Sequence, residues 1–441
     1  MKSDDASVRT RFVDPIWVTA TLWFFVLLGA ATADLTPLSP VFLIFLLVGI
    51  GAHLGGMVVR RSIQTRCSRM LVAVVGGKQP HARTLTLRTL MRANRITWLL
   101  LAFEAAGMVY FFWAYSKVVP SLDTTGFLVA RSLYLDEVLG LSDKLFLYTT
   151  HLTLFGMGIL FFSARAYREA TVLGARVSKT TVNLVAITTF VVSLMTTGRT
   201  APLLVILSYS FYCLRFGLFT KKTFVVVFGV LSLGMFFVVA FALGKEGLGD
   251  STQLGTGEAM INLGRLYFFS APIAMQEVVM SNQVVSNACS NIFSYPVDLL
   301  RRLGMFAQCD ARELQFVFIP VATNVFTFFR AYWEDFRWAY PAAMFVTGYL
   351  IETVHIGAFQ KPEYCAYLYP FVLNALLLQI FEEQLFSNGS VFAYLTVIYI
   401  VFSFVYRLPL SRYTRCRATS RSVPRLPQHE NDRNFLAGFI Q

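Results

Sequence analysis

Residues 40–61 read PVFLIFLLVGIGAHLGGMVVRR, an apolar run that ends on two arginines. A helix needs roughly 17 to 25 mostly apolar residues to cross about 30 Å of hydrocarbon, and residues 41–59 reach that length. Backbone groups in a bilayer must be hydrogen-bonded within the segment, so the run is predicted to be a helix rather than an open strand. Comparable runs lie at 16–32, 97–115, 224–243 and 390–406.

The composition of the whole chain supports the same class. Of 441 residues, 56% are hydrophobic, 15% aromatic and only 14% charged, whereas soluble chains carry about 25% charged residues. We therefore expect an all-α integral membrane protein with about ten transmembrane helices. The predicted spans are roughly 16–32, 41–59, 96–116, 145–164, 180–196, 201–215, 223–243, 339–356, 363–381 and 390–406.

The formal net charge of +13 is unevenly distributed along the chain. Nine Lys or Arg and no Asp or Glu lie between Arg60 and Arg95, which places this loop in the cytoplasm by the positive-inside rule. With the spans above, the cytoplasmic side carries 27 basic and 7 acidic residues, and the opposite side carries 11 and 16. The basicity thus follows from topology, both termini are predicted to be cytoplasmic, and no nucleic-acid partner is expected.

The segment 244–338 is the largest predicted external region, and its 95 residues are too many for a simple connection. Its apolar part, Leu314 to Phe329, is only 16 residues long and contains Pro320 and Asn324. A crossing there would move the Arg-rich C-terminus outside, so we expect an interfacial or re-entrant segment, or a helix packed under the loop domain. The expected organisation is a seven-span membrane bundle (1–243), a largely helical periplasmic loop domain (244–338), a C-terminal membrane part (339–406) and a basic cytoplasmic tail (407–441).

Two of the six cysteines, Cys289 and Cys309, fall in this external loop. A disulfide between them is chemically permitted on the oxidising side of the membrane, and two free buried thiols are the alternative. No Cys or His spacing resembles a metal site, so we expect neither a metal nor another cofactor.

Several arginines on the predicted external side are flanked by apolar or aromatic residues. Guanidinium groups pair bidentately with phosphate and stay charged, so several of them around one cavity suit a pyrophosphate ligand. For any single arginine the alternative is an interfacial anchor or an ion pair with a carboxylate. Arg199 stands out because it lies in a four-residue turn that needs no charge. The arginines concerned are Arg131, Arg199, Arg265 and Arg330.

Carboxylates on the same side include Glu334 and Asp335, which lie among aromatic residues. A carboxylate near a sugar hydroxyl can act as a general base, and aromatic rings suit a stacked pyranose. The alternative is an aromatic belt at the membrane interface, where Tyr and Trp are common. Glu104 lies inside a span and should face the bundle interior, with a structural hydrogen bond favoured over catalysis.

Together these features resemble the bacterial O-antigen polymerase family, the oligosaccharide repeat-unit polymerases. The resemblance covers nearly the whole chain as topology. Two local stretches also carry it, namely Thr197-Gly198-Arg199-Thr200 at the start of a span and TFFRAYWEDF at 327–336. The second is similar to the family's Thr-Phe, Tyr and Asp-Phe-Gly pattern, with Arg337 in place of the glycine.

The resemblance implies a metal-independent glycosyltransferase with a C-type membrane fold in the bacterial inner membrane, acting at the periplasmic face without a cofactor. The donor would be a glycan on undecaprenyl pyrophosphate, and the acceptor a hydroxyl of the incoming lipid-linked unit. A chain-length regulator protein is a further candidate partner. The implied roles are pyrophosphate binding by Arg199, Arg265, Arg131, Arg330 and Lys245, catalysis by Asp335 or Glu334 with Arg199, and sugar contact by Tyr267, Tyr332 and Trp333.

Three other functions remain open. A flippase for the same lipid-linked sugar should concentrate polar groups along a path at mid-membrane, and the sequence instead gathers them on one face. An O-antigen ligase differs from a polymerase only in weak motifs. A structural scaffold would account for the spans but not for the external arginines.

Overall fold

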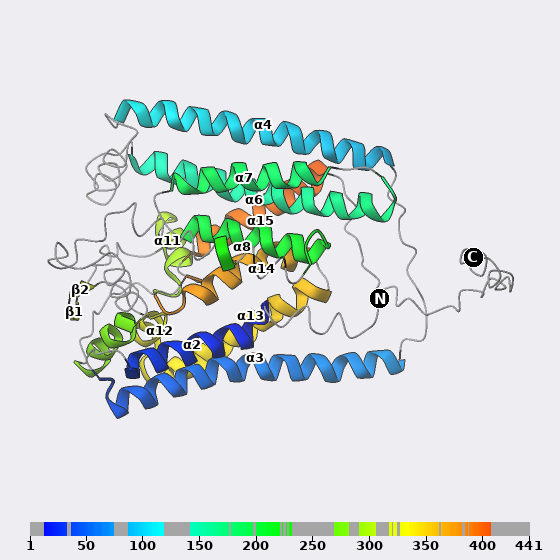
Figure 1. Cartoon of the computed structure of the whole chain (residues 1–441). Helices are drawn as coiled ribbons and strands as arrows, with labels where there is room; N and C mark the ends of the chain where they lie inside the picture. The colour runs from blue at the N-terminus through cyan, green and yellow to red at the C-terminus, as the bar shows by residue number, and fades with distance from the viewer. Residues whose placement is uncertain are drawn as a thin grey trace, which may run out of the picture.

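The computed structural model is a bundle of long helices that lie side by side (Figure 1). α2, α3 and α13 lie along one side of the bundle, α4 lies along the opposite side, and the other long helices lie between them. The helices are α2 (Pro15–Thr32), α3 (Pro40–Val74), α4 (Leu87–Val118), α6 (Ser142–Val172), α7 (Lys179–Leu194), α8 (Thr200–Phe216), α13 (Tyr340–Gln360), α14 (Glu363–Leu378) and α15 (Gly389–Tyr406). The structure describes residues 13–32, 37–74, 87–118, 142–175, 178–196, 200–220, 223, 226, 229–231, 269–281, 291–305, 317–319, 321–323, 327–360, 363–381, 384–386 and 388–406.

Four helices in the described part of the chain are long and apolar enough to cross a membrane. They span Pro40–Arg66, Arg88–Ala114, Phe329–Phe359 and Gly389–Tyr406. Shorter apolar helices accompany them at Pro15–Ala30, Lys179–Leu194, Thr200–Phe216 and Glu363–Leu378. The expectation of an α-helical membrane protein is therefore supported at this level. The number of crossings, the orientation and the division into domains stay predictions.

The long helices of the described structure coincide with the predicted apolar runs, and the seventh predicted span is the exception. Of the seventh predicted span, 223–243, only residues 223, 226 and 229–231 belong to the described structure, and they are helical. α3, α4 and α6 extend beyond the predicted apolar runs, since a helix can continue into the polar region outside the hydrocarbon. α14 contains Pro370 and remains helical on both sides of it.

α3 and α13 pack closely against each other, and glycines make the contact possible. A Cβ added to Gly56 would lie 2.0 Å from the carbonyl oxygen of Phe345, and one added to Gly348 would lie 2.0 Å from that of His53. Small residues allow the backbones of two helices to approach closely. Such close packing matters in a bilayer, because the hydrophobic effect does not drive helices together in lipid. The pair is thus held backbone to backbone, and it fixes His53 against α13.

Buried side chains form two cores. One lies around α6, α8, α14 and α15 and is rich in stacked and edge-on aromatic rings such as Phe161, Tyr212 and Tyr367. The other joins α2, α3 and α13 to the segment before α13 through Trp23, Phe45 and Phe329. The second core carries the candidate site.

One end of the bundle, at the left of Figure 1, carries the short elements of the predicted loop domain. They are α11 (Ser294–Arg302), β1 (Val317–Ile319), β2 (Val321–Thr323) and α12 (Phe329–Phe336). β1 and β2 pair antiparallel, with Phe318 opposite Ala322. A helix packed under the loop domain, one of the alternatives for 314–329, is therefore wrong for residues 317–319 and 321–323. The sequence there has β-branched residues on both sides of Pro320, and these residue types favour strands and turns over helix.

An ion-pair network binds the first helix to α3 and α13, on the side of the bundle away from α12. The Arg61 guanidinium donates to both oxygens of Asp14 at 2.9 Å and to both oxygens of Glu352 at 2.8 and 3.0 Å. Asp14 also accepts the backbone N–H of Ile16 at the start of α2, 3.0 Å away. Tyr369 on α14 donates to the carbonyl of Val13. Glu352 therefore has a structural role in this network.

Candidate functional site

Most of the segment Thr327–Phe336 folds into α12 (Phe329–Phe336), just before α13. The helix ends where Arg337 adopts φ 50° and ψ −126°, the only positive φ of a non-glycine residue in the described segments. Glycine adopts such a conformation without cost, whereas another residue is strained by about 1–3 kcal/mol. The backbone at position 337 therefore favours glycine, and this chain has arginine there.

Arg330 and Glu334 form an ion pair on one face of α12. Arg330 Nε lies 2.6 Å from Glu334 Oε1, and both side chains are less than a tenth exposed. The alternative foreseen for a single external arginine, an ion pair with a nearby carboxylate, is what the structure shows here. Because the positive charge is already matched, Arg330 is better suited to hold α12 in shape than to bind a diphosphate alone.

Asp335 binds the chain just before α11. Its carboxylate accepts the backbone N–H groups of Asn291 and Ile292 at 2.9 and 2.8 Å, and also the Asn291 side-chain amide at 3.0 Å. The same amide donates to Glu334 Oε2 at 2.9 Å. Hydrogen bonds to a charged acceptor are strong, each worth roughly 1.5–3 kcal/mol. Glu334 and Asp335 thus tie residues 291–292 to α12, and their catalytic role stays a prediction.

The two aromatic residues of α12 that were predicted to contact sugar are packed inside the protein. Tyr332 donates or accepts a 2.9 Å hydrogen bond with Thr347 on α13 and is 1% exposed. Trp333 is 3% exposed and lies edge-on to Phe45, 5.3 Å between ring centroids. By contrast, Trp338, just after α12, is 85% exposed.

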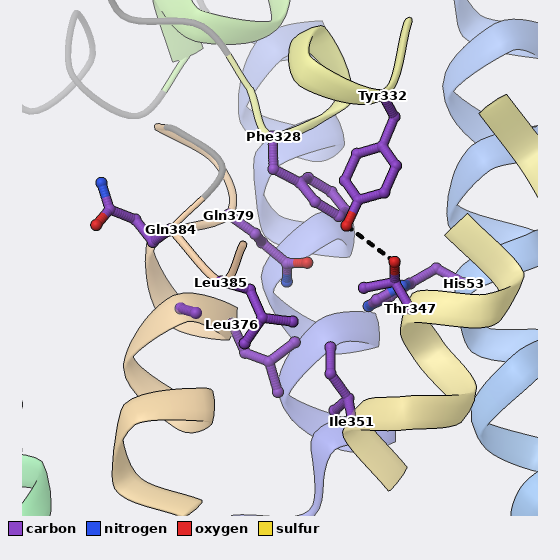
Figure 2. Close-up of a pocket in the computed structure, with 10 residues that line it drawn as sticks. His53, Phe328, Tyr332, Thr347, Ile351, Leu376, Gln379, Gln384 and Leu385 are labelled. Atoms are coloured by element: carbon purple, nitrogen blue, oxygen red, sulfur yellow. Dashed lines mark hydrogen bonds between the residues drawn. The ribbon is translucent and has the colours of Figure 1, made fainter. Parts of the chain in front are cut away.

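A small cavity lies beneath α12, between α3, α13 and the C-terminal end of α14 (Figure 2). Its volume is about 20 Å³, and one water-sized group needs roughly 10–15 Å³. In Figure 2 the amide of Gln379 points toward Tyr332 and Thr347, whereas that of Gln384 points away. The lining residues are His53, Phe328, Tyr332, Thr347, Ile351, Ala375, Leu376, Gln379, Gln384 and Leu385.

Polar atoms without a partner gather around this cavity. His53 Nε2 and both amide atoms of Gln379 are buried and have no hydrogen-bond partner, and Thr327 Oγ1, at the start of the segment, is in the same condition. Buried polar groups in proteins are nearly always hydrogen-bonded, so each of these atoms needs an explanation. These atoms are inaccessible, and the surface that lines the cavity is almost wholly apolar.

Sequence reasoning did not find His53, Thr347 or Gln379. The available signal was a histidine in the middle of an apolar run, GIGAHLGG, because a polar residue inside a span usually faces the protein interior. The other predicted site residues lie outside the described residues, and their roles stay predictions. They are Arg131, Arg199, Lys245, Arg265, Tyr267 and the cysteines Cys289 and Cys309.

Glu104 on α4 is fully buried and faces the bundle interior, which confirms that expectation. It meets Thr189 of α7 across Gly156 of α6, because a Cβ on Gly156 would lie 2.2 Å from Glu104 Oε1 and 2.4 Å from Thr189 Oγ1. The glycine leaves room for the carboxyl group at a three-helix junction.

No family model, no curated protein and no solved structure matches this chain. The chemistry of the site is taken from its own residues and their geometry.

Proposed function

We propose that the chain is a membrane polymerase of lipid-linked oligosaccharide repeat units. It would transfer a growing glycan from undecaprenyl pyrophosphate to a hydroxyl of the incoming unit, at the outer face of the bacterial inner membrane. The observation that carries the proposal is the placement of the TFFRAYWEDF segment. Its residues Phe329–Phe336 form a helix above a small cavity, and its carboxylates hold residues 291 and 292 of the segment that is predicted to be external.

The reaction requires the protein mainly to position the two substrates and to supply positive charge. Pyrophosphate is a competent leaving group, so the enzyme needs to align two substrates and stabilise developing negative charge. Arg199 and Arg265, with Arg131 and Lys245, are proposed to hold the pyrophosphate. Arg330 is assigned a supporting role here, because its Nε is bound to Glu334. The C-type fold and the absence of a metal requirement belong to the same proposal.

The glycan profile of a strain that lacks the gene tests this function. We expect one repeat unit on the lipid core, since transfer of single units would continue without polymerisation. Expression of the wild-type chain should restore the ladder of long polymers. Many repeats stranded on undecaprenyl pyrophosphate would instead indicate a ligase, and units trapped in the inner leaflet would indicate a flippase.

Replacing Arg199 with Ala in the same strain tests the site. The variant should insert at the wild-type level and yield no long polymer, because the pyrophosphate loses a bidentate partner. Arg199→Lys, which keeps the charge without the fork geometry, should be intermediate. A normal ladder from Arg199→Ala would contradict the assigned role.

A flippase is the second candidate, and Glu104 is the observation in its favour. A fully buried carboxyl at a three-helix junction is typical of proton relays in transporters. In a polymerase the same group would be a structural hydrogen-bond partner of Thr189.

Glu104→Gln separates these two functions. The amide keeps the size and hydrogen-bonding capacity of the side chain but cannot exchange a proton. For a polymerase we expect the full ladder of chain lengths and an unchanged protein level. Loss of polymer, with lipid-linked units accumulating in the inner leaflet and normal insertion, would favour the flippase.

A further inference from the structure

We propose that α11 is an interfacial helix whose apolar side is covered by the acyl chains of membrane lipids. The helix (Ser294–Arg302) lies at the end of the bundle that carries α12 (Figure 1). The partner that this surface fits is the bilayer around the bundle. The inference depends on the membrane character of the chain and goes beyond its proposed reaction.

The sequence of α11 separates into two sides. With roughly 3.6 residues per turn, Pro296, Leu299 and Leu303 fall on one side of the helix and its C-terminal turn. The opposite side carries the positions Ser294, Asp298, Arg301 and Arg302. A helix of a soluble protein buries such an apolar side against its core, so the exposure of this side decides what the helix does.

The apolar side of α11 is exposed rather than packed. Leu299 is 50% exposed and Leu303 is 64% exposed. Gly304, at φ 75°, ends the helix, and the N–H of Met305 then donates to the carbonyl of Leu300 at 3.0 Å, as in a common C-terminal turn. Met305 is itself 66% exposed. In a membrane protein, a short amphipathic helix of this kind lies along the interface with its apolar side among the lipid chains.

The contacts of α11 place it where two membrane helices begin. A Cβ added to Gly389, the first residue of α15, would lie 2.9 Å from Tyr295 of α11. Just before α11, the N–H groups of Asn291 and Ile292 donate to Asp335 of α12. α15 and the continuous segment of α12 and α13 are both long and apolar enough to cross a membrane. α11 therefore lies at the level where the hydrocarbon region ends.

Exposed aromatic rings mark the same level. Trp338, just before α13, is 85% exposed and lies edge-on to the buried Trp333, with 5.3 Å between ring centroids. Phe293, just before α11, is 51% exposed and meets Phe336 edge-on at 6.4 Å. Aromatic residues, tryptophan above all, are enriched in the headgroup region of membranes. Both rings agree with a helix that lies in this region.

The charges of α11 complement lipid headgroups. Arg301 and Arg302 occupy positions in its last turn, and Asp298 is the one acidic residue of its sequence. Basic residues on the polar side of an interfacial helix are attracted to anionic phospholipids. A helix with net positive charge and an exposed apolar side therefore fits an anionic lipid surface in both respects.

Photo-crosslinking identifies what covers the helix. The photoreactive residue p-benzoylphenylalanine replaces Leu299 or Leu303 in the full chain, reconstituted in vesicles of phosphatidylethanolamine and phosphatidylglycerol. Both positions are exposed, so the larger ring should be accommodated. After illumination, we expect the peptides that contain these positions to gain the mass of one phospholipid. Asp298, on the polar side, is the matched control, and the same replacement there should give little lipid adduct.

Other products would overturn the inference. A cross-link to a second copy of the chain at both leucines would make this side of α11 a dimer interface. A cross-link to another segment of the same chain would mean that the protein itself covers the helix. Equal lipid adducts at Leu303 and Asp298 would show that lipid contact is not confined to the apolar side, and no adduct at either leucine would show that this side faces water.

Tryptic cleavage gives a second measurement that needs no photoreactive residue. It uses nanodiscs of the same lipids, which leave both faces open to protease, and follows cleavage after Arg301 and Arg302. Leu299→Gln combined with Leu303→Gln should accelerate this cleavage at least about tenfold, because proteolysis follows the population of the opened helix and two lipid-covered leucines no longer oppose opening. Ser294→Gln, on the polar side, should leave the rate unchanged. Equal rates for the wild type and the double variant would contradict a lipid-bound helix.

Discussion

Replacing Gly56 or Gly348 with alanine is expected to separate α3 from α13 and to remove most of the folded protein from the membrane. Each added Cβ would lie 2.0 Å from a backbone carbonyl oxygen of the facing helix, and a backbone atom cannot rotate away as a side chain can. The helices must move apart, which also disturbs the hydrogen bond from His53 to Met344. We expect a loss of about 3 kcal/mol in the free energy of unfolding, at the upper end of the range for overpacking.

Gly51→Ala is the control on the same helix, because nothing lies within 4 Å of a Cβ at Gly51. It should leave folding unchanged or slightly improved, since alanine favours helix over glycine. The measurement is the amount of monodisperse protein after detergent extraction, together with its thermal midpoint. Equal yields and midpoints for Gly56→Ala, Gly348→Ala and Gly51→Ala would show that α3 and α13 are not packed this closely.

The contrast between these glycines indicates what a sequence can and cannot reveal. The run GIGAHLGG predicts a buried or membrane helix because its residues are apolar and continuous. It does not say that Gly56 touches the facing backbone while Gly51 meets open space, because that depends on which helix packs beside it. Phe345, the partner of Gly56, lies nearly 300 positions further along the chain.

In the candidate site, too, some contacts follow from local spacing in the sequence and others depend on tertiary packing. Arg330 and Glu334 are four residues apart, so a helix places them side by side, and their ion pair could be anticipated from local spacing. The partner of Asp335 is Asn291, across a segment whose path the sequence does not define. His53 and Gln379 come from helices far apart in the chain, and only tertiary packing brings them to one cavity. The β1–β2 hairpin was missed because an apolar run of this length fits either a strand or a helix.

Replacing Arg61 with Met is expected to destabilise the packing of α2 against α3 and α13. The substitution leaves Asp14 and Glu352 buried without their shared cation, and the side chain of Glu352 is only 1% exposed. Removing one partner of a buried ion pair typically costs 3–5 kcal/mol. Because the Arg61 side chain is 36% exposed, solvent moderates the loss, and we expect about 3 kcal/mol in the free energy of unfolding.

Two further variants show that the loss arises from orphaned carboxylates rather than from the missing side chain. Arg60→Met removes the neighbouring arginine, which donates to Thr353 and Gln64 at 2.9 and 3.2 Å, and should cost about 1 kcal/mol, the value of an ordinary hydrogen bond. Arg61→Met combined with Asp14→Asn and Glu352→Gln neutralises both carboxylates and should recover much of the stability. Thermal midpoints in one detergent provide the comparison. An Arg61→Met protein as stable as Arg60→Met would mean that α2 is held to the bundle by apolar packing alone, and that the network contributes no net stability.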